Sequence, residues 1–232
     1  MHRTQSSEAM IFLSGLAGIL LVLTAEAKVG KSSQGKYCSE TEECLLFDLI
    51  CETDSYELRH YSSVKWVSTN ETGYIMDFAL MRAFKRLFGY ITGQNMQGKK
   101  IEMTAPVVVK VIDQKSFWEE RVFRMSFLLP SEHQMTPPKP TDDKVFIQEW
   151  PEMKVYVKSY GGWMTSLSDK MKASSLCSSL DSAGSQYNKE YHYAVGYDSP
   201  MKLFNRHNEV WLVAEGDPEC SSSSEEEYSF FN

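Results

Sequence analysis

One histidine of the sequence, His60, lies in a segment whose residue types suit iron ligation. In an extended strand, His60 shares one face with Tyr56 and Leu58, while the residues between them point to the other face. A neutral imidazole on an apolar wall can coordinate the iron of a haem, whose porphyrin then packs against the apolar neighbours. Histidines in such positions are more often structural or exposed. The pattern therefore offers His60 as a candidate metal ligand and leaves a structural role open.

The sequence motifs for catalysis are incomplete. The run Gly93–Lys100 nearly matches the phosphate-binding pattern G-x-x-x-x-G-K-[ST], but Lys100 replaces the hydroxyl that would bind Mg²⁺. The run also follows a predicted helix, whereas a phosphate loop follows a strand. The chain has no G-x-S-x-G motif, no H-E-x-x-H motif and no metal-spaced Cys/His set, and its other histidines are scattered, at His2, His133, His192 and His207. These absences favour a binding protein over an enzyme.

The elements that would position these residues occur in two successive halves with the same order. In the first half, residues 56–61 and 64–67 are β-rich and are separated by two serines, which predicts a hairpin. A helix follows, because apolar residues recur at helical spacing, at Leu80, Phe84, Leu87, Phe88 and Ile91. Residues 100–112 and 122–129 then predict two further strands.

A proline-rich segment, residues 136–140, separates the halves. The second half is predicted to contain strands at 145–147 and 153–158, a helix whose apolar positions are Ala173, Leu176, Cys177 and Leu180, and strands at 191–195 and 210–213. Each half alone would bury only a thin core. The sequence therefore predicts one α+β domain, a distorted antiparallel β-barrel or curved sheet of two pseudo-symmetric ββαββ halves with two flanking helices.

Both ends of the chain differ from the middle in composition. Residues 9–25 carry no charge and lead into an A-x-A pattern, which predicts a secretory signal peptide cleaved after Ala27. No second long apolar run exists, so the cleaved chain is predicted to be secreted and to have no stable membrane span. The expected parts are the signal peptide at 1–27, an N-terminal extension at 28–43, a folded ligand-binding domain at 44–218 and a disordered acidic Ser/Glu tail at 219–232.

Charge argues against nucleic acid as a partner. The chain has 24 Lys+Arg against 31 Asp+Glu, a formal net charge of -7, and no basic cluster. Three of the acidic residues lie in the tail segment Ser221–Glu227, where Ser223 and Ser224 have the S-x-E pattern of secretory-pathway kinases. A phosphorylated tail would attract Ca²⁺. One alternative is therefore an extracellular matrix or mineral-associated protein that acts through its tail.

The chain has five cysteines, and the odd number leaves at least one outside intramolecular disulfides. In the oxidising compartment that a signal peptide implies, all are disulfide candidates: Cys38, Cys44, Cys51, Cys177 and Cys220. One bridge could join the N-terminal segment to Cys220, but the sequence does not fix the pairing. Asn70-Glu71-Thr72 is an N-glycosylation acceptor in a predicted surface turn.

Several segments together resemble the SOUL haem-binding protein family. The matching stretches are Tyr56-Glu57-Leu58-Arg59-His60-Tyr61, Lys65-Trp66-Val67-Ser68-Thr69, Ile101-Glu102-Met103-Thr104-Ala105-Pro106-Val107, Pro137-Pro138-Lys139-Pro140, Gly196-Tyr197-Asp198-Ser199-Pro200-Met201-Lys202-Leu203 and Asn205-Arg206-His207-Asn208-Glu209-Val210-Trp211-Leu212. They extend over about residues 44–215, nearly all of the predicted domain.

The resemblance implies binding of haem or related tetrapyrroles, without catalysis, by a distorted antiparallel barrel with two flanking helices. In one branch of the family the histidine at the position of His60 is the proposed axial ligand of the iron. In the other branch the tetrapyrrole lies in an apolar cleft beside the first helix and the loop before the last strand. The corresponding positions here are Phe84, Leu87, Phe88, Pro200, Met201 and Lys202, with Lys85, Lys202 and Arg206 as cations that could pair with haem propionates.

The leading hypothesis is thus a secreted, non-catalytic binder of haem or related tetrapyrroles, with no nucleic-acid partner and no stable membrane span. Protein partners stay open. An alternative is a binder of another apolar ligand or of a protein partner on the same fold. The fold is also similar to bacterial effector-binding domains, whose clefts take diverse small molecules, and fold alone does not decide between these functions.

Overall fold

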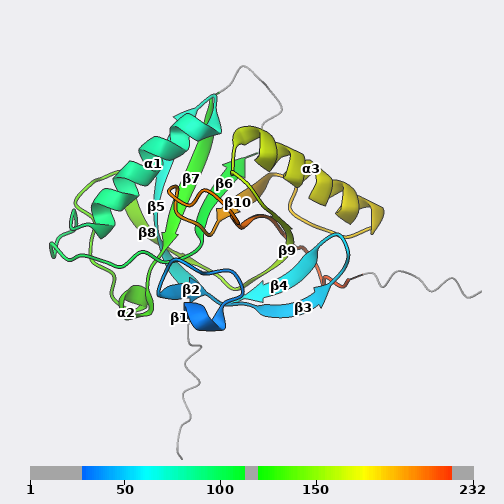
Figure 1. The fold of residues 1–232 in the computed structure, drawn as a ribbon, viewed down its shortest axis with the longest axis horizontal. Coiled ribbons are helices and arrows are strands. Elements are labelled where there is room, and N and C mark those ends of the chain that lie inside the picture. The colour runs from blue at the N-terminus through cyan, green and yellow to red at the C-terminus, as the bar shows by residue number, and fades with distance from the viewer. Residues whose placement is uncertain (1–27, 113–119, 221–232) are drawn as a thin grey trace, which may run out of the picture.

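A computed structural model describes residues 28–112 and 120–220 of the chain (Figure 1). The predicted signal peptide and the serines and glutamates from residue 221 onward lie outside the described residues. The helices are α1 (Met76–Ile91), α2 (Ser131–Gln134) and α3 (Ser166–Ser182). The strands are β1 (Val29–Lys31), β2 (Glu43–Leu45), β3 (Asp48–Glu52), β4 (Glu57–Tyr61), β5 (Val64–Gly73), β6 (Val107–Ile112), β7 (Arg121–Leu128), β8 (Val145–Trp150), β9 (Met153–Tyr160), β10 (Tyr191–Gly196) and β11 (Asn208–Val213).

Nine strands form one curved antiparallel sheet in the order β3-β4-β9-β11-β10-β6-β7-β5-β8, and β1 pairs separately with β2. The two halves have the predicted element order, β4-β5-α1-β6-β7 and β8-β9-α3-β10-β11. In the sheet, β4-β9-β11-β10 corresponds to β8-β5-β7-β6, which is the predicted pseudo-symmetry. The α+β fold class is confirmed in its curved-sheet form, because β3 and β8 remain as open edges.

The predicted hairpin between residues 56–61 and 64–67 is wrong. β4 pairs with β3 and β9, and β5 pairs with β7 and β8, so the two neighbouring strands do not pair with each other. Tight hairpins need residues with positive φ in the turn. Ser62 and Ser63 have none, since Asn205 is the one non-glycine with positive φ in the described part of the chain. The exchange of β4 and β8 between the halves joins them into one sheet.

The predicted strand at residues 100–112 is shorter than expected. Only Val107–Ile112 join the ladder with β7 and β10. Pro106 has no N–H to donate, so the ladder begins after it. The preceding residues are held by other contacts: Thr104 Oγ1 donates to the Leu128 carbonyl, and Ala105 forms a bridge with Cys44.

The core lies on both faces of the sheet. One face carries α1, over β5, β7 and β8, and α3, over β9 and β11 (Figure 1). The other face buries Trp66, Trp211 and Tyr61. Residues 28–47 cover this second face, with Cys38, Cys44 and Leu45 buried in the same cluster. The predicted N-terminal extension therefore packs as part of the fold.

Helix α1 packs with a face slightly different from the predicted stripe. Its buried residues are Met76, Ala79, Ala83, Leu87, Tyr90 and Ile91. The small Ala79 and Ala83 let the helix approach the sheet closely. Leu80 and Phe84 consequently lie at the border of this face, and Phe88 is 48% exposed. Helix α3 begins with a capping box between Thr165 and Ser168, and Cys177 is only partly buried on it.

Two disulfides connect the chain, Cys38–Cys44 and Cys51–Cys220, and Cys177 is not in a disulfide. The second bridge joins β3 to the end of the described chain, as the sequence suggested for an N-terminal cysteine. The prediction that Asn70 lies in a surface turn is wrong, because Asn70 lies within β5. Its side chain is exposed and accepts a hydrogen bond from Arg124. In the described ranges, no helix combines the length and the apolar character needed to cross a bilayer.

Candidate functional site

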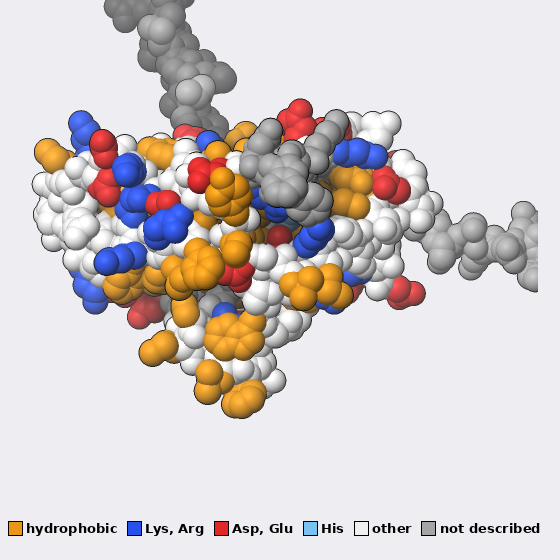
Figure 2. All heavy atoms as spheres, turned by 90° about the horizontal axis from the view of Figure 1, so that it is seen from above, with side chains coloured by type: hydrophobic (Ala, Val, Ile, Leu, Met, Phe, Trp, Pro, Cys, Tyr) orange, Lys and Arg blue, Asp and Glu red, His pale blue; other side chains and the backbone are white. Residues whose placement is uncertain are grey.

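A cleft opens between α1 and the loops that precede α3 and β11, and we call it the α1 cleft. Its volume is about 420 Å³, within the usual range for small-molecule sites. The walls are largely apolar and include Leu80, Met81, Phe84, Val107, Met125 and Met164. On the face that carries the two long helices, hydrophobic side chains gather at the surface (Figure 2).

Arg206 holds the loop that forms one side of the α1 cleft. Its Nη1 donates to the carbonyls of Ser199 and Lys202, each at 2.7 Å, and Nη2 donates to the Asp198 carbonyl at 3.3 Å. The guanidinium lies 4.4 Å from the centroid of the Trp163 ring. The Nε atom is buried and has no hydrogen-bond partner in the part of the chain that is described.

Asn208 and Gly196 form the floor of the same cleft. Asn208 Nδ2 donates to the Gly162 carbonyl at 2.7 Å, whereas its buried Oδ1 has no partner among the residues described. A Cβ atom at Gly196 would lie 3.6 Å from Met164 Cε and 3.9 Å from Asn208 Oδ1. A side chain added at Gly196 would therefore lie among residues that line the cleft.

The structure brings together some of the sequence-predicted cleft residues and separates others. Phe84 and Pro200 line the α1 cleft, and Phe88 stacks on Phe84 with ring centroids 5.8 Å apart. Leu87 is fully buried between α1 and the sheet and does not reach the cleft. Helical geometry explains this, because Leu87 lies one turn from Ala83 on the sheet-facing side.

The remaining predicted residues lie around the cleft. Lys85 is exposed on α1, and Met201 is almost fully exposed in the loop before β11. The Lys202 ammonium bonds to the Asp198 carboxylate at 2.5 Å. Lys202 therefore has a carboxylate partner already, which leaves Arg206 as the predicted cation that lines the cleft.

His60 does not line the α1 cleft. The predicted alternation of β4 is present, because Tyr56 and Leu58 pack in one cluster beneath α3. At His60, however, the ring nitrogens lie 3.6 Å from the Asp48 carboxylate and 3.7 Å from the Glu152 carboxylate, and the side chain is 30% exposed. The surroundings of the imidazole are acidic, in contrast to the apolar wall predicted from sequence.

The neighbours of His60 on the opposite face form a buried ionic network. Arg59 is fully buried and donates from Nε to Glu57 at 2.6 Å, and from Nη1 to Glu209 at 3.0 Å and to the Tyr61 hydroxyl at 3.1 Å. The guanidinium also lies 4.0 Å from the centroid of the Phe47 ring. Arg59 thus joins β4 to β11, two strands that flank β9 in the sheet.

Glu209 is the acceptor at the centre of this network. Its Oε1 accepts from Arg59 and from His207 Nε2 at 2.8 Å, and its Oε2 accepts from the Tyr197 hydroxyl at 3.1 Å and from Trp211 Nε1 at 2.7 Å. Burial would raise the pKa of Glu209, but the His207 hydrogen bond and the Arg59 charge outweigh burial, and the pKa is lowered. Three of the segments that resemble the haem-binding family, residues 56–61, 196–203 and 205–212, thus meet here as a structural unit.

Because of this network, stability should fall in acid. Burial also opposes ionisation of Glu57, and the hydrogen bond from Arg59 again lowers its pKa below the ordinary 4.5. A carboxyl group with a depressed folded-state pKa stabilises the fold fully above about pH 4.5, and that contribution is lost as pH falls through the folded-state value. We expect the urea concentration at the unfolding midpoint to decrease as the pH is lowered below about 4.5. In Glu209→Gln this decrease with pH should be less steep than in the wild type. Equal slopes for the two proteins would contradict this.

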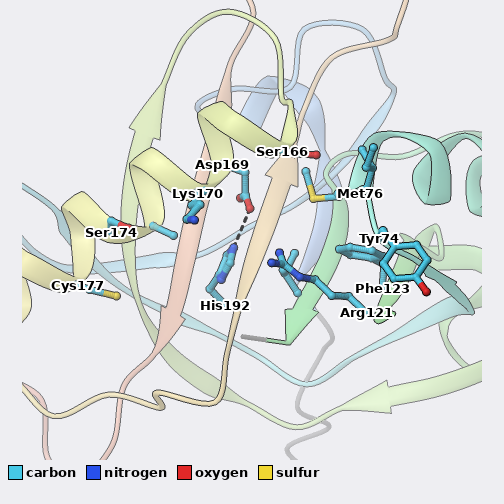
Figure 3. Close-up of a pocket in the computed structure, with 13 residues that line it drawn as sticks. Tyr74, Met76, Arg121, Phe123, Ser166, Asp169, Lys170, Ser174, Cys177 and His192 are labelled. Atoms are coloured by element: carbon cyan, nitrogen blue, oxygen red, sulfur yellow. Dashed lines mark hydrogen bonds and ion pairs between the residues drawn. The ribbon is translucent and has the colours of Figure 1, made fainter. Parts of the chain in front are cut away.

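A second cavity, of about 560 Å³, lies between the start of α1 and α3 (Figure 3). On its polar side, His192 Nε2 lies 2.9 Å from Asp169 Oδ2, and both side chains are 4% exposed. The Ser166 hydroxyl, which lines the same cavity, donates to Asp77. The Asp169–His192 pair links α3 to the central strand β10, a contact that fixes the helix on the sheet.

The sequence analysis missed several residues of the α1 cleft. Trp163, Met164, Gly196 and Asn208 all line it. Trp163 follows Gly161-Gly162, and Gly162 has a positive φ of 84°. A double glycine directly before a tryptophan was the available sequence signal for this side of the cleft.

Comparison with known families gives one match over most of the described domain. The family model described as "SOUL heme-binding protein" matches residues 42–213. Heme-binding protein 2 of Homo sapiens is 39% identical over 164 residues, which are 71% of this chain and 80% of that protein. Heme-binding protein 1 of Mus musculus is 32% identical over 162 residues, which are 70% of this chain and 85% of that protein.

Among solved structures, the cryo-EM structure of an EcmrR–DNA complex is similar with a TM-score of 0.52. It is 10% identical in sequence, and the similarity covers 71% of this chain and 59% of that chain. At this identity the likeness concerns the fold alone.

Proposed function

Because the chain belongs to the SOUL heme-binding protein family, we propose that it binds haem or a related tetrapyrrole in the α1 cleft. The observation that carries this proposal is the apolar lining of the cleft, to which Phe84 of α1 contributes together with Met164 and Trp163. Large, mostly apolar clefts with a few fixed polar groups are typical of cofactor sites.

The polar groups of the cleft support the same ligand class. Arg206 lines the cleft, and its guanidinium is the cation there that would pair with a propionate of the tetrapyrrole. The residues that line the cleft include the thioethers of Met81, Met125 and Met164 and no histidine. Thioether sulfur is an iron ligand in some haem proteins, so the cleft itself offers a ligand type to the metal.

The axial role of His60 is a separate prediction, and a haemin titration of His60→Ala distinguishes it from cleft binding. If the tetrapyrrole lies in the α1 cleft, His60→Ala keeps the Soret band and the affinity of the wild type, because His60 does not line that cleft. A shifted Soret band together with an affinity loss of about tenfold or more would instead assign the iron ligand to His60. Glu152→Ala, which removes a neighbouring exposed carboxylate, is the control.

We further propose that the protein acts outside the cell as a binder and not as an enzyme. The two disulfides support an oxidising compartment. Expression in animal cells should therefore release a chain whose first residue is Lys28, with a glycan on Asn70, as measured by mass spectrometry. Retention of residues 1–27 in a chain that stays in the cell would contradict secretion.

A further inference from the structure

A short segment of the N-terminal extension contacts the loop that borders the α1 cleft. This cleft loop, residues 197–207, lies between β10 and β11. Its residues that line the cleft are Asp198, Pro200 and Arg206. The residues of the extension that contact the cleft loop are Tyr37, Ser39 and Glu40, which we call the clasp.

Two polar contacts join the clasp to the cleft loop. Glu40 Oε2 accepts a hydrogen bond from the Ser199 N–H at 2.7 Å. Ser39 Oγ accepts a hydrogen bond from Lys202 Nζ at 3.1 Å. These two contacts lie on either side of Pro200 in the sequence, so the clasp holds the cleft loop both before and after a residue that lines the cleft.

Tyr37 adds a ring contact at the end of the cleft loop. Its ring stacks on the ring of His207, with centroids 3.7 Å apart and planes 8° from parallel. The Tyr37 hydroxyl donates to Glu57 at 3.4 Å, and Glu57 accepts from the buried Arg59. Tyr37 therefore connects the cleft loop to the buried ionic network.

A disulfide anchors the clasp to the core. Cys38, which lies between Tyr37 and Ser39 in the sequence, is bridged to Cys44 of β2. Cys44 is 1% exposed and forms a bridge with Ala105. Because Cys44 is fixed in the core, the bridge limits how far the clasp residues can move from the cleft loop.

The cleft loop itself is cross-linked. Arg206 Nη1 donates to the carbonyls of Ser199 and Lys202, and Asp198 accepts from the His207 N–H at 2.6 Å and from Lys202 Nζ at 2.5 Å. A loop with such internal bonds moves as a unit. Contacts made by the clasp at a few points therefore orient all of its cleft-lining residues.

We propose that the clasp sets the affinity of the α1 cleft by fixing the position of the cleft loop, and that the Cys38–Cys44 bridge keeps the clasp in place. This inference rests on the proposed function, since the ligand is the tetrapyrrole of the α1 cleft. A wall that is fixed before the ligand arrives lowers the entropy cost of binding. Residues 37–40 precede residues 42–213, which match the family model, so the clasp adds to the ligand site from outside that match.

Haemin titration of the purified protein, with its two disulfides formed, tests the clasp. We expect Ser39→Ala/Glu40→Ala to raise the dissociation constant about tenfold, because two hydrogen bonds to the cleft loop are lost. Glu40→Gln should restore binding to within about threefold of Ser39→Ala alone when it replaces Glu40→Ala, since its amide oxygen still accepts from Ser199. Glu42→Ala is the control: it removes an exposed carboxylate between the same two bridged cysteines and should bind as the wild type does.

The two disulfides provide a second comparison. Cys38→Ala/Cys44→Ala should weaken haemin binding by about tenfold or more, because the clasp is no longer tied to β2. Cys51→Ala/Cys220→Ala removes the other bridge, whose cysteines do not line the α1 cleft, and should bind haemin as the wild type does. Equal affinities for the two double variants would contradict the role of the Cys38–Cys44 bridge. Ser39→Ala/Glu40→Ala keeps both bridges and tests the clasp even if a cysteine variant fails to fold.

Amide hydrogen exchange, followed by NMR without haemin, separates positioning from a direct effect on the ligand. The N–H groups of Lys202 and His207 bond within the cleft loop, to the Ser199 carbonyl and the Asp198 carboxylate. If the clasp fixes the whole loop, both should exchange about tenfold faster in Ser39→Ala/Glu40→Ala and at the wild-type rate in Glu42→Ala. Loss of one local contact at Ser199 would leave these two amides unchanged.

Wild-type exchange at Lys202 and His207 in Ser39→Ala/Glu40→Ala, or wild-type haemin affinity in that variant, would overturn the proposal. A wild type that does not bind haemin would instead refute the proposed function. Faster exchange of the two amides would in that case still support the hold of the clasp on the cleft loop, so the two failures are distinguishable.

Discussion

Replacing Glu209 with glutamine is expected to lower the free energy of unfolding by about 3–5 kcal/mol. Four donors converge on the two carboxylate oxygens, from Arg59, His207, Tyr197 and Trp211. An amide of the same shape must turn its NH₂ group toward one pair of these donors, so buried hydrogen bonds are lost and donors oppose each other. The buried Arg59 charge also loses one of its two carboxylate partners. Urea denaturation followed by circular dichroism measures the effect.

The control for this experiment is Glu149→Gln. Glu149 is exposed and accepts a hydrogen bond from the Ser63 hydroxyl, so its loss should cost no more than about 0.5 kcal/mol. A double-mutant cycle with Arg59→Met should show coupling of about 1 kcal/mol or more between Arg59 and Glu209. A Glu209→Gln protein within about 1 kcal/mol of the wild type would show that the network does not stabilise the fold.

Replacing Gly196 with leucine is expected to weaken haemin binding by about tenfold to a hundredfold. The added side chain starts 3.6 Å from Met164 Cε and 3.9 Å from Asn208 Oδ1, so it extends into the α1 cleft. Overpacking of an occupied site typically costs about 1–3 kcal/mol, which corresponds to this loss of affinity. Absorbance titration of haemin at the Soret band measures the dissociation constant.

Gly196→Ala is the matched control, because its single methyl group meets its neighbours at ordinary contact distances. It should bind haemin within about threefold of the wild type, and both variants should remain folded, since Gly196 does not have a positive φ. If Gly196→Leu binds haemin as tightly as Gly196→Ala, the tetrapyrrole does not lie in the α1 cleft, and a site elsewhere in the molecule must be sought.

The order of elements could be predicted from sequence because it depends on local patterns. The helical spacing of Leu80, Phe84 and Leu87 and the alternation of β7 are visible over a few residues. The pairing of strands is non-local. Nothing near Ser62 and Ser63 indicates that β4 joins β9, which lies about ninety residues away in the chain.

The candidate site could be predicted only in part for a similar reason. The resemblance predicts Phe84 and Pro200 as cleft residues, and both line the cleft. It also predicts Leu87 as a cleft residue, but Leu87 lies on the face of α1 that packs on the sheet. The strongest motif residues proved to be structural. Arg59 and Glu209 are 150 positions apart, so their pairing becomes visible only when β4 and β11 flank the same strand.

The open edges of the sheet have a consequence for how the molecule behaves at high concentration. An unpaired edge strand is a template on which other chains can add strands and aggregate. β3 opposes this with Asp48 and Glu52, with a register shift between Leu49 and Cys51, and with the disulfide at Cys51. At the other edge β8 is only six residues long and is followed directly by Pro151. These features oppose the addition of further strands at both edges of the open sheet.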